Sequence, residues 1–209
     1  MGITHVVRGE EWISSTPKHL LLYRWLGFPT PQFAHMPLLR NTDKSKISKR
    51  KNPAARLTWF LEQGYLPEAL VNFLALLGYG QPGEEEIFGF EAFSAGFEWS
   101  RVNTVGPVFD LDKLNWLNGH YLRALDGDEF ARRLVEFARR EKPSAAPDVI
   151  TAGAPLVQER VATLLQALDM LGFLLVDERE YTVDDAAAAK QLGAPGQAVL
   201  AAALPAVQA

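Results

Sequence analysis

The first forty residues have the pattern strand, helix, strand, and this order constrains the fold more than any other feature. Residues 4–8 are short, β-branched and followed by glycine, which predicts a strand. Thr16 and Pro17 predict the N-cap and the first position of a helix that ends at Gly27, and a second strand follows at 33–39. Strands joined through a helix pair in parallel, so we expect a small βαβ unit.

Parallel sheets normally have both faces covered by other elements. A sheet of only two parallel strands with one helix would leave apolar side chains exposed and is hard to stabilise alone. The sequence predicts no further strand after residue 39. We therefore expect the unit to be a remnant of a larger sheet. A partly exposed apolar patch around Val6, Val7, Leu38 and Leu39 would then promote self-association.

The rest of the chain has apolar residues at helical spacing, in segments separated by turn residues. We expect helices at 53–62, 67–77, 90–97, 110–121, 126–140, 156–176 and 183–192. A stretch rich in Pro, Ser and Ala at 142–147 predicts a linker. Eight aromatic side chains are expected to fill a compact helical core: Phe88, Phe90, Phe93, Phe97, Trp99, Phe109, Trp116 and Tyr121. The expected fold class is mainly α.

Composition excludes several classes of protein. The 209 residues are 48% hydrophobic and 22% charged, as in ordinary globular domains. Cysteine is absent, which excludes disulfides and cysteine-ligated zinc and fits a cytoplasmic protein. No apolar run approaches the roughly 20 residues of a membrane span, so we expect no membrane partner. His5, His19 and His35 lack metal-ligand spacing, so we interpret them as structural or supporting groups and expect no metal site.

Charge is unevenly distributed along the chain. Through residue 56 there are ten Lys and Arg against three Asp and Glu, whereas the remainder has 11 bases and 22 acids. Five of the bases fall in eight residues, in the loop Lys44-Ser-Lys-Ile-Ser-Lys-Arg-Lys51. Flexible ammonium groups interleaved with small hydroxyls suit a polyphosphate. A solvated basic loop is the alternative, and Ile47, which could anchor the loop to the core, favours the phosphate interpretation.

The basic loop also carries a resemblance. Lys46-Ile-Ser-Lys-Arg50 resembles the Lys-Met-Ser-Lys-Ser signature loop of class I aminoacyl-tRNA synthetases, in the form found in bacterial glutamyl-tRNA synthetases. Four further segments resemble that family in the expected order: Val7-Arg-Gly-Glu-Glu-Trp-Ile-Ser-Ser-Thr-Pro-Lys-His19, His35-Met-Pro-Leu-Leu-Arg-Asn41, Gly106-Pro-Val-Phe-Asp110 and Lys113-Leu-Asn-Trp-Leu-Asn-Gly119. The similarity weakens after about residue 123 and returns at Gln158-Glu-Arg-Val-Ala-Thr-Leu164.

The resemblance implies a reaction in which ATP and glutamate give glutamyl-adenylate and the glutamyl group then passes to the terminal ribose of tRNA. It implies ATP with Mg²⁺, glutamate and tRNA(Glu) as ligands, leaves tRNA(Gln) open, and implies a monomeric parent enzyme without zinc. Arg8 is the implied glutamate ligand, and Arg160 the implied reader of an anticodon base. The implied ATP contacts are Glu11, Trp12, Leu39, Lys46, Lys49 and Arg50. The implied catalytic residues are Lys46, Ser48 and Lys49, of which Lys49 stabilises the charge that develops as pyrophosphate leaves.

Three parts follow from the resemblance. Residues 1–40 correspond to a βαβ remnant of the class I nucleotide-binding fold. Residues 41–125 correspond to the signature loop and a helical stem-contact domain. Residues 126–209 correspond to part of a helical anticodon-binding domain. A glutaminyl-tRNA synthetase fits less well, because its anticodon region consists of β-barrels.

The sequence also departs from the family. It has no His-Ile-Gly-His-like segment, most of the nucleotide-binding sheet is missing, and so is the second anticodon-binding domain. We therefore expect a portion of a glutamate–tRNA ligase that is inactive alone. The alternative is a stand-alone, non-catalytic tRNA-binding module or regulator derived from a synthetase.

Overall fold

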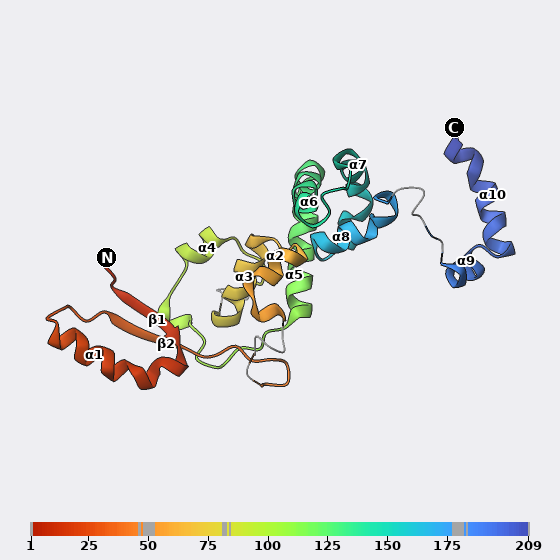
Figure 1. Ribbon diagram of the computed structural model, residues 1–209. Coiled ribbons are helices and arrows are strands. Elements are labelled where there is room, and N and C mark those ends of the chain that lie inside the picture. The colour runs from red at the N-terminus through yellow and green to blue at the C-terminus, as the bar shows by residue number, and fades with distance from the viewer. Residues whose placement is uncertain are drawn as a thin grey trace.

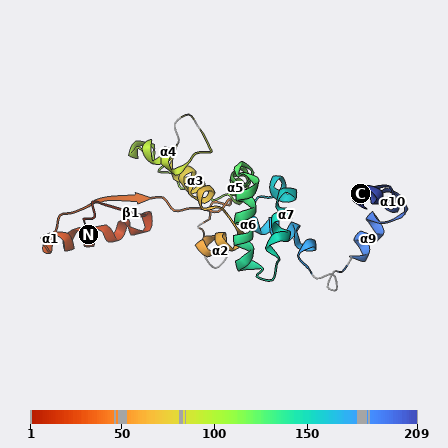
Figure 2. The same cartoon turned by 90° about the horizontal axis from the view of Figure 1, so that it is seen from above.

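The computed structural model describes residues 2–45, 47, 53–80, 83, 85–176, 182 and 184–208. Its parts follow one another along an elongated molecule (Figures 1 and 2). A strand–helix–strand unit lies at the N-terminal end, two groups of helices follow, and the last two helices lie beyond them. The mainly α fold with a small parallel sheet is therefore confirmed.

The βαβ unit is formed by β1 (His5–Gly9), α1 (Thr16–Trp25) and β2 (Gln32–Met36). The two strands pair in parallel as expected, with Val6 opposite Phe33. The second strand ends at Met36 rather than at residue 39, since Pro37 has no N–H to donate to the ladder.

The expected N-cap of α1 is wrong. A 3₁₀ helix, η1 (Glu10–Ser15), leads directly into α1, so Ser15 occupies the N-cap position and Thr16 is already helical. The Thr16 hydroxyl donates to the Trp12 carbonyl oxygen at 3.1 Å instead of accepting from the first turn of α1. The preceding 3₁₀ turn thus takes the place of a side-chain cap.

The two faces of the sheet meet different parts of the chain. Val6 and Arg8 line a cavity together with side chains of α1. Val7 and Met36, on the opposite face, line a cavity with Leu74 and a group of aromatic side chains beyond it. This division follows from the alternation of side chains along a strand.

No residue of β1, η1, α1 or β2 is buried. Val7 is 49% exposed, whereas Val6, Leu38 and Leu39 are half-buried, so the partial exposure expected there is observed. These residues do not form one patch, because Val6 and Val7 lie on opposite faces of the sheet. The exposed apolar surface also extends over α1 and the residues after it, through Leu20, Leu21, Leu22, Trp25, Leu26 and Phe28.

The first group of helices covers the middle of the chain. Its elements are η2 (Pro53–Ala55), α2 (Leu57–Gln63), α3 (Pro67–Gly78), α4 (Phe90–Ala95), η4 (Trp99–Arg101) and α5 (Leu111–Ala124). These elements agree with the expected helices, except that the segment expected at 53–62 is divided into η2 and α2 and that η4 was not expected. Gly64 ends α2 in the left-handed conformation, with φ of 73°.

The second group begins after Asp126, which caps α6 by accepting from the Glu129 N–H at 2.8 Å. Its elements are α6 (Gly127–Glu141), α7 (Pro147–Val157), η5 (Gln158–Arg160), α8 (Leu164–Met170) and η6 (Gly172–Leu174). The terminal helices are α9 (Asp185–Gln191) and α10 (Ala194–Gln208). None of the described helices is long and apolar enough to cross a membrane.

The single long helix expected at 156–176 is wrong. Helix α7 begins at Pro147, at the end of the expected linker, and buries Ile150, Ala154 and Val157 at helical spacing. The chain then turns, and Thr163 takes an extended conformation to cap α8 by accepting from the Gln166 N–H. The apolar residues of 156–176 therefore do not form one helical face, because this cap interrupts them.

Buried side chains form two clusters rather than one aromatic core. Phe88 and Phe109 are buried, but four of the eight aromatic residues are exposed: Phe90, Phe97, Trp99 and Trp116. The short helix α4 has no buried residue, and Trp116 lies on the outer side of α5, so the expected compact aromatic core is wrong at these positions.

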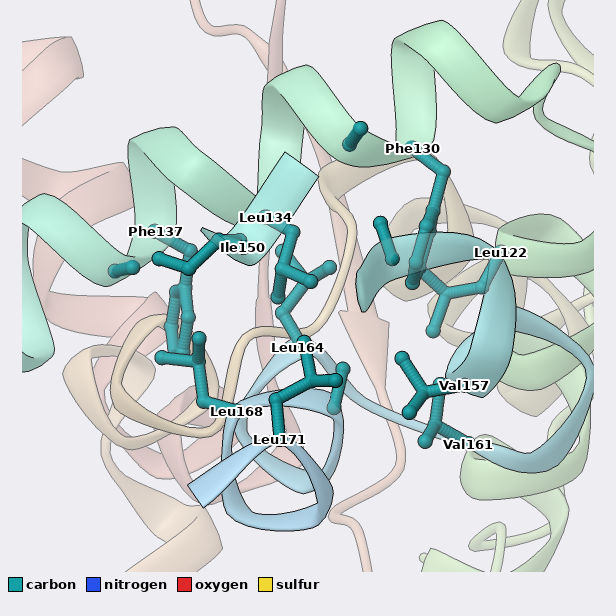
Figure 3. Packing of buried hydrophobic residues seen from close by; sticks show 14 of the residues in the cluster. Leu122, Phe130, Leu134, Phe137, Ile150, Val157, Val161, Leu164, Leu168 and Leu171 are labelled. Atoms are coloured by element: carbon teal, nitrogen blue, oxygen red, sulfur yellow. The ribbon is translucent and has the colours of Figure 1, made fainter. Parts of the chain in front are cut away.

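Helices α3 and α5 contribute to both clusters. The first cluster joins α6, α7 and α8 through large aliphatic and aromatic side chains, and Figure 3 shows how they interdigitate. It also contains Leu66 and Leu122, whereas Phe73, Leu114 and Leu117 belong to the second cluster with α2. One helix pair therefore holds the two helical groups together.

Two segments that carry the resemblance have clear structural roles. In the segment 106–110, backbone groups pair with Arg40: its N–H donates to the Pro107 carbonyl at 3.0 Å, and its carbonyl accepts from the Phe109 N–H at 2.8 Å. A Cβ on Gly106 would lie 3.1 Å from the Leu38 carbonyl oxygen, so glycine permits this close approach. Asp110 then caps α5.

In the segment 113–119, buried Asn118 links three parts of the chain. Its Oδ1 accepts from the Leu66 N–H at 2.8 Å, and its Nδ2 donates to the Ala162 carbonyl at 2.5 Å. Asn115 Oδ1 accepts from the Tyr65 hydroxyl at 2.6 Å. These polar side chains fix α5 against the segment that precedes α3 and the segment that precedes α8.

Candidate functional site

Arg8 lies between two aromatic rings at the end of β1. Its guanidinium carbon is 5.5 Å from the centroid of the Trp12 ring and 5.3 Å from that of Phe33. The terminal nitrogens lie 3.4 and 3.3 Å from His19 Nδ1, and Nε is buried without a hydrogen-bond partner. Cation–π contacts of this kind stabilise a guanidinium that is partly removed from water.

Beside Arg8 is a cavity of about 390 Å³. Arg8, His19 and Tyr23 bring polar side chains to its wall, and Val6 and Leu22 bring apolar ones. An arginine at this wall suits a carboxylate, because the guanidinium presents several N–H donors to its two oxygens.

Glu11 and Trp12 reach this region because η1 begins directly after the strand. Glu11 is exposed, and its carboxylate lies against Gly9, where any Cβ would collide with it. Trp12 is 46% exposed, so one part of its ring covers Arg8 and another is open to solvent. The structure therefore brings Arg8, Glu11 and Trp12 together.

Leu39 follows the end of β2 and packs against the second cluster. It lines an apolar cavity of about 390 Å³ together with Ile47, Phe60 and Phe109. Ile47 is half-buried there, as expected for an anchor of the basic loop. Lys46, Ser48, Lys49 and Arg50 lie outside the described residues.

Arg160 is exposed on η5 and makes no ion pair within the described part of the chain. The neighbouring Gln158 fixes η5, since its Nε2 donates to the carbonyls of Leu122 and Leu125 at 3.0 and 2.9 Å. Figure 1 places η5, between α7 and α8, far along the molecule from β1. The structure thus keeps Arg160 apart from Arg8 and Trp12.

The clearest pKa shifts lie away from these residues. Hydrogen bonds from Arg132 and Arg133 lower the pKa of Glu129 to about 2, and Arg133 also pairs with Glu68 on α3 at 2.5 Å. Burial raises the pKa of Tyr65 to about 12. Glu129 holds Arg133, which joins α6 to α3, and the Tyr65 hydroxyl donates to Asn115 on α5, so we interpret these shifts as structural rather than catalytic.

Sequence reasoning missed Phe33 and the specific contacts of two histidines. Phe33 and His35 alternate along β2 on the same face as Arg8, a signal that the expected strand already contained. His35 Nε2 lies 3.1 Å from the Thr16 hydroxyl and so links β2 to α1. Among the described residues, no group of three His, Cys, Asp or Glu is placed to hold a metal ion.

Comparison with known proteins defines the class first. Residues 1–116 match the family model of the catalytic domain of class I tRNA synthetases for glutamate and glutamine (E and Q), so the chain belongs to that family.

Two curated relatives and a solved structure narrow the assignment. The chain is 60% identical over its whole length to a glutamate–tRNA ligase of Acidothermus cellulolyticus and 56% identical over 91% of its length to that of Cutibacterium acnes. It spans 42% and 40% of these relatives. A crystal structure of a glutamate–tRNA ligase from Elizabethkingia meningosepticum, in complex with its amino acid, matches 95% of this chain with a TM-score of 0.71 at 27% identity. The match covers 42% of the length of that ligase. The chain thus corresponds to a portion of a glutamate–tRNA ligase, as expected.

Proposed function

We propose that this chain contributes to the ATP-dependent activation of glutamate and its transfer to tRNA(Glu). Family membership and the 60% identical relative support the reaction class. The structural observation that carries the proposal is Arg8, which has no acidic partner within the described residues and lies at the wall of a cavity. It binds a carboxylate of glutamate there.

Glu11, Trp12 and Leu39 contact ATP in this proposal, and Lys46, Lys49 and Arg50 neutralise its phosphates. Lys46, Ser48 and Lys49 act in catalysis, with Lys49 stabilising the charge on the leaving pyrophosphate. Ile47 holds the loop against the helices through its contacts with the second cluster. Mg²⁺ enters with ATP, bound by the phosphates, since no acidic cluster in the described residues fits it.

The helical parts contact tRNA. Residues 41–125 act as the signature loop and stem-contact domain, and residues 126–209 as part of an anticodon-binding domain in which Arg160 reads a base. Exposure of Arg160 on a fixed turn supports this role, because a guanidinium can then donate to a base edge. Aminoacylation of tRNA places the protein in the cytoplasm, and tRNA(Gln) is a second candidate substrate.

A retardation assay with tRNA(Glu) and a non-cognate tRNA, repeated over a salt series, tests the tRNA role. Affinity should fall by about 0.9 log units per log unit of salt for each duplex phosphate neutralised. Replacing Lys44, Lys46, Lys49 and Lys51 by Ala should weaken binding to all tRNAs alike. Salt-insensitive retention, or no change in this quadruple variant, would contradict the proposal.

A single substitution tests the anticodon role. Arg160→Ala should weaken binding of tRNA(Glu) by about tenfold and leave the non-cognate tRNA nearly unchanged, because a base contact and not only a phosphate contact is lost. Arg139→Ala, which removes the same charge from an exposed position on α6, is the matched control. Equal losses for both tRNAs would show that Arg160 contacts phosphate only.

ATP–pyrophosphate exchange separates ligase chemistry from a tRNA-binding module. The 209 residues contain the second signature loop but no His-Ile-Gly-His-like segment, so they should show no exchange above a Lys49→Ala control. Measurable ATP–pyrophosphate exchange would overturn the expectation that a His-Ile-Gly-His-like segment is needed.

A further inference from the structure

We propose that His19 is a positioning residue for Arg8, and that its neutrality is what leaves the charge of Arg8 available to a carboxylate. The inference rests on the proposed function for the identity of that carboxylate as glutamate. Its structural part rests on contacts between β1, η1, α1 and β2 and stands independently.

The aromatic rings alone do not fix Arg8. Trp12 and Phe33 lie 5.5 and 5.3 Å from the guanidinium carbon and define the region in which the group sits. Contact with a ring face is only weakly directional, because the ring offers a diffuse negative potential and no single acceptor atom. A directional acceptor is needed to set where the N–H groups point.

His19 is that acceptor. Its Nδ1 lies 3.4 and 3.3 Å from the two terminal nitrogens of Arg8. A guanidinium has donors only, so Nδ1 must present its lone pair, and the imidazole proton must be on Nε2. His19 lies one turn into α1, and Pro17 and η1 fix where that helix begins. The point at which α1 begins therefore determines where His19 lies, and His19 in turn orients Arg8.

A neutral acceptor has a consequence that a carboxylate would not have. Within the described residues Arg8 forms no salt bridge, and its Nε is buried without a partner. An Asp or Glu at position 19 would orient the guanidinium but also neutralise it. A histidine that accepts through Nδ1 orients the group and leaves its positive charge for a ligand in the adjacent cavity.

Three substitutions separate these two effects. His19→Asn can place an amide oxygen near the position of Nδ1, so it should keep both the order and the charge of Arg8. His19→Asp should keep the order but cancel the charge. His19→Ala should lose the order. His120→Ala, on the exposed side of α5, is the matched control.

The first measurement needs no ligand. Spectra of the ¹⁵N-labelled arginine side chains, with Arg8 assigned through Arg8→Lys, report its order in the 209-residue protein. The Arg8 Nε–H signal should be rigid in wild type, His19→Asn, His19→Asp and His120→Ala, and mobile in His19→Ala. An ordered Arg8 in His19→Ala, with circular dichroism confirming the fold of all variants, would overturn the positioning role. Should His19→Ala fail to fold, the ¹⁵N spectrum of His19 in wild type decides, because a proton on Nδ1 would equally overturn it.

The second measurement is calorimetric titration with L-glutamate. Relative to wild type, His19→Asn should bind within about threefold, whereas His19→Ala and His19→Asp should each bind about tenfold or more weakly. Undiminished binding by His19→Asp would overturn the argument from charge. If wild type binds no glutamate while the Arg8 spectra depend on His19 as described, the proposed glutamate site fails and the positioning role stands.

Discussion

Replacing Asn118 tests whether α5 joins the two helical groups through hydrogen bonds. Asn118 is fully buried and pairs with the Leu66 N–H and the Ala162 carbonyl. In Asn118→Ala the buried Leu66 N–H and the half-buried Ala162 carbonyl both lose their partner. Each unpaired buried group costs about 1–3 kcal/mol, so the variant should lose roughly 3 kcal/mol of unfolding free energy. At about 2–4 °C per kcal/mol for a chain of this size, the Tm should fall by about 10 °C.

The assay is urea and thermal unfolding followed by circular dichroism. Asn115→Ala is the matched control on the same helix, since it removes a single hydrogen bond from the Tyr65 hydroxyl at a half-buried position and should cost about 1 kcal/mol. Asn118→Asp should be intermediate or worse, because it keeps an acceptor for Leu66 but turns a carboxylate towards the Ala162 carbonyl. A loss below about 0.5 kcal/mol in Asn118→Ala would refute the reasoning.

Three further outcomes are expected. Gly64→Ala should lower the Tm far more than Gly127→Ala. At Gly64 φ is 73° and a Cβ would lie 2.6 Å from Leu164 Cβ, whereas the space around Gly127 is open. Equal melting temperatures of the two variants would contradict this. The lowered pKa of Glu129 means that its ion pairs stabilise the fold fully above pH 4.5 and cease to do so as the pH falls towards about 2. Urea midpoints of Glu129→Gln should therefore be below wild type at pH 7 and converge with it in that interval; a constant difference would be inconsistent. Trp25 is 73% exposed, so Trp25→Glu should reduce a concentration-dependent rise in mass seen by sedimentation equilibrium; a wild type that stays monomeric would exclude self-association through α1.

Local signals in the sequence were sufficient where the chain follows its own propensities. The βαβ unit and Gly64 as the end of α2 are visible in short segments, because strand propensity and left-handed glycine act over a few residues. The helix expected at 126–140 also formed, although Asp126 caps it and is not its first residue. Parallel pairing was also predictable, since a helix between two strands leaves little alternative.

Tertiary contacts decided the elements that the sequence did not predict. Helix α7 begins within a segment that looks like a linker, and burial of Ile150 and Ala154 against α6 stabilises it. Local sequence also does not predict which aromatic side chains are exposed. Trp116 and Phe109 both have aromatic side chains, but Phe109 is buried and Trp116 lies exposed on the outer side of α5. No local sequence pattern predicts which of the two is buried.

The candidate site was predictable in part. The resemblance indicated Arg8 and Trp12 from one continuous segment, and the structure brings them into contact. Phe33 and His19 come from two other elements, so their contacts with Arg8 depend on strand register and on the start of α1. The ligand-binding and catalytic roles of all the site residues stay predictions: Arg8, Glu11, Trp12, Leu39, Lys46, Ser48, Lys49, Arg50 and Arg160.

The sharing of α5 between the two clusters has a consequence for hydrogen exchange. Leu114 and Leu117 face one cluster and Leu122 the other, and all three are fully buried, so neither helical group can open without disturbing α5. Their amide protons should exchange only through global unfolding, whereas those of α1, which buries no residue, should exchange through small local openings. The slowest-exchanging amides of this chain would then include those of α5, one of the two helices that join its two helical groups.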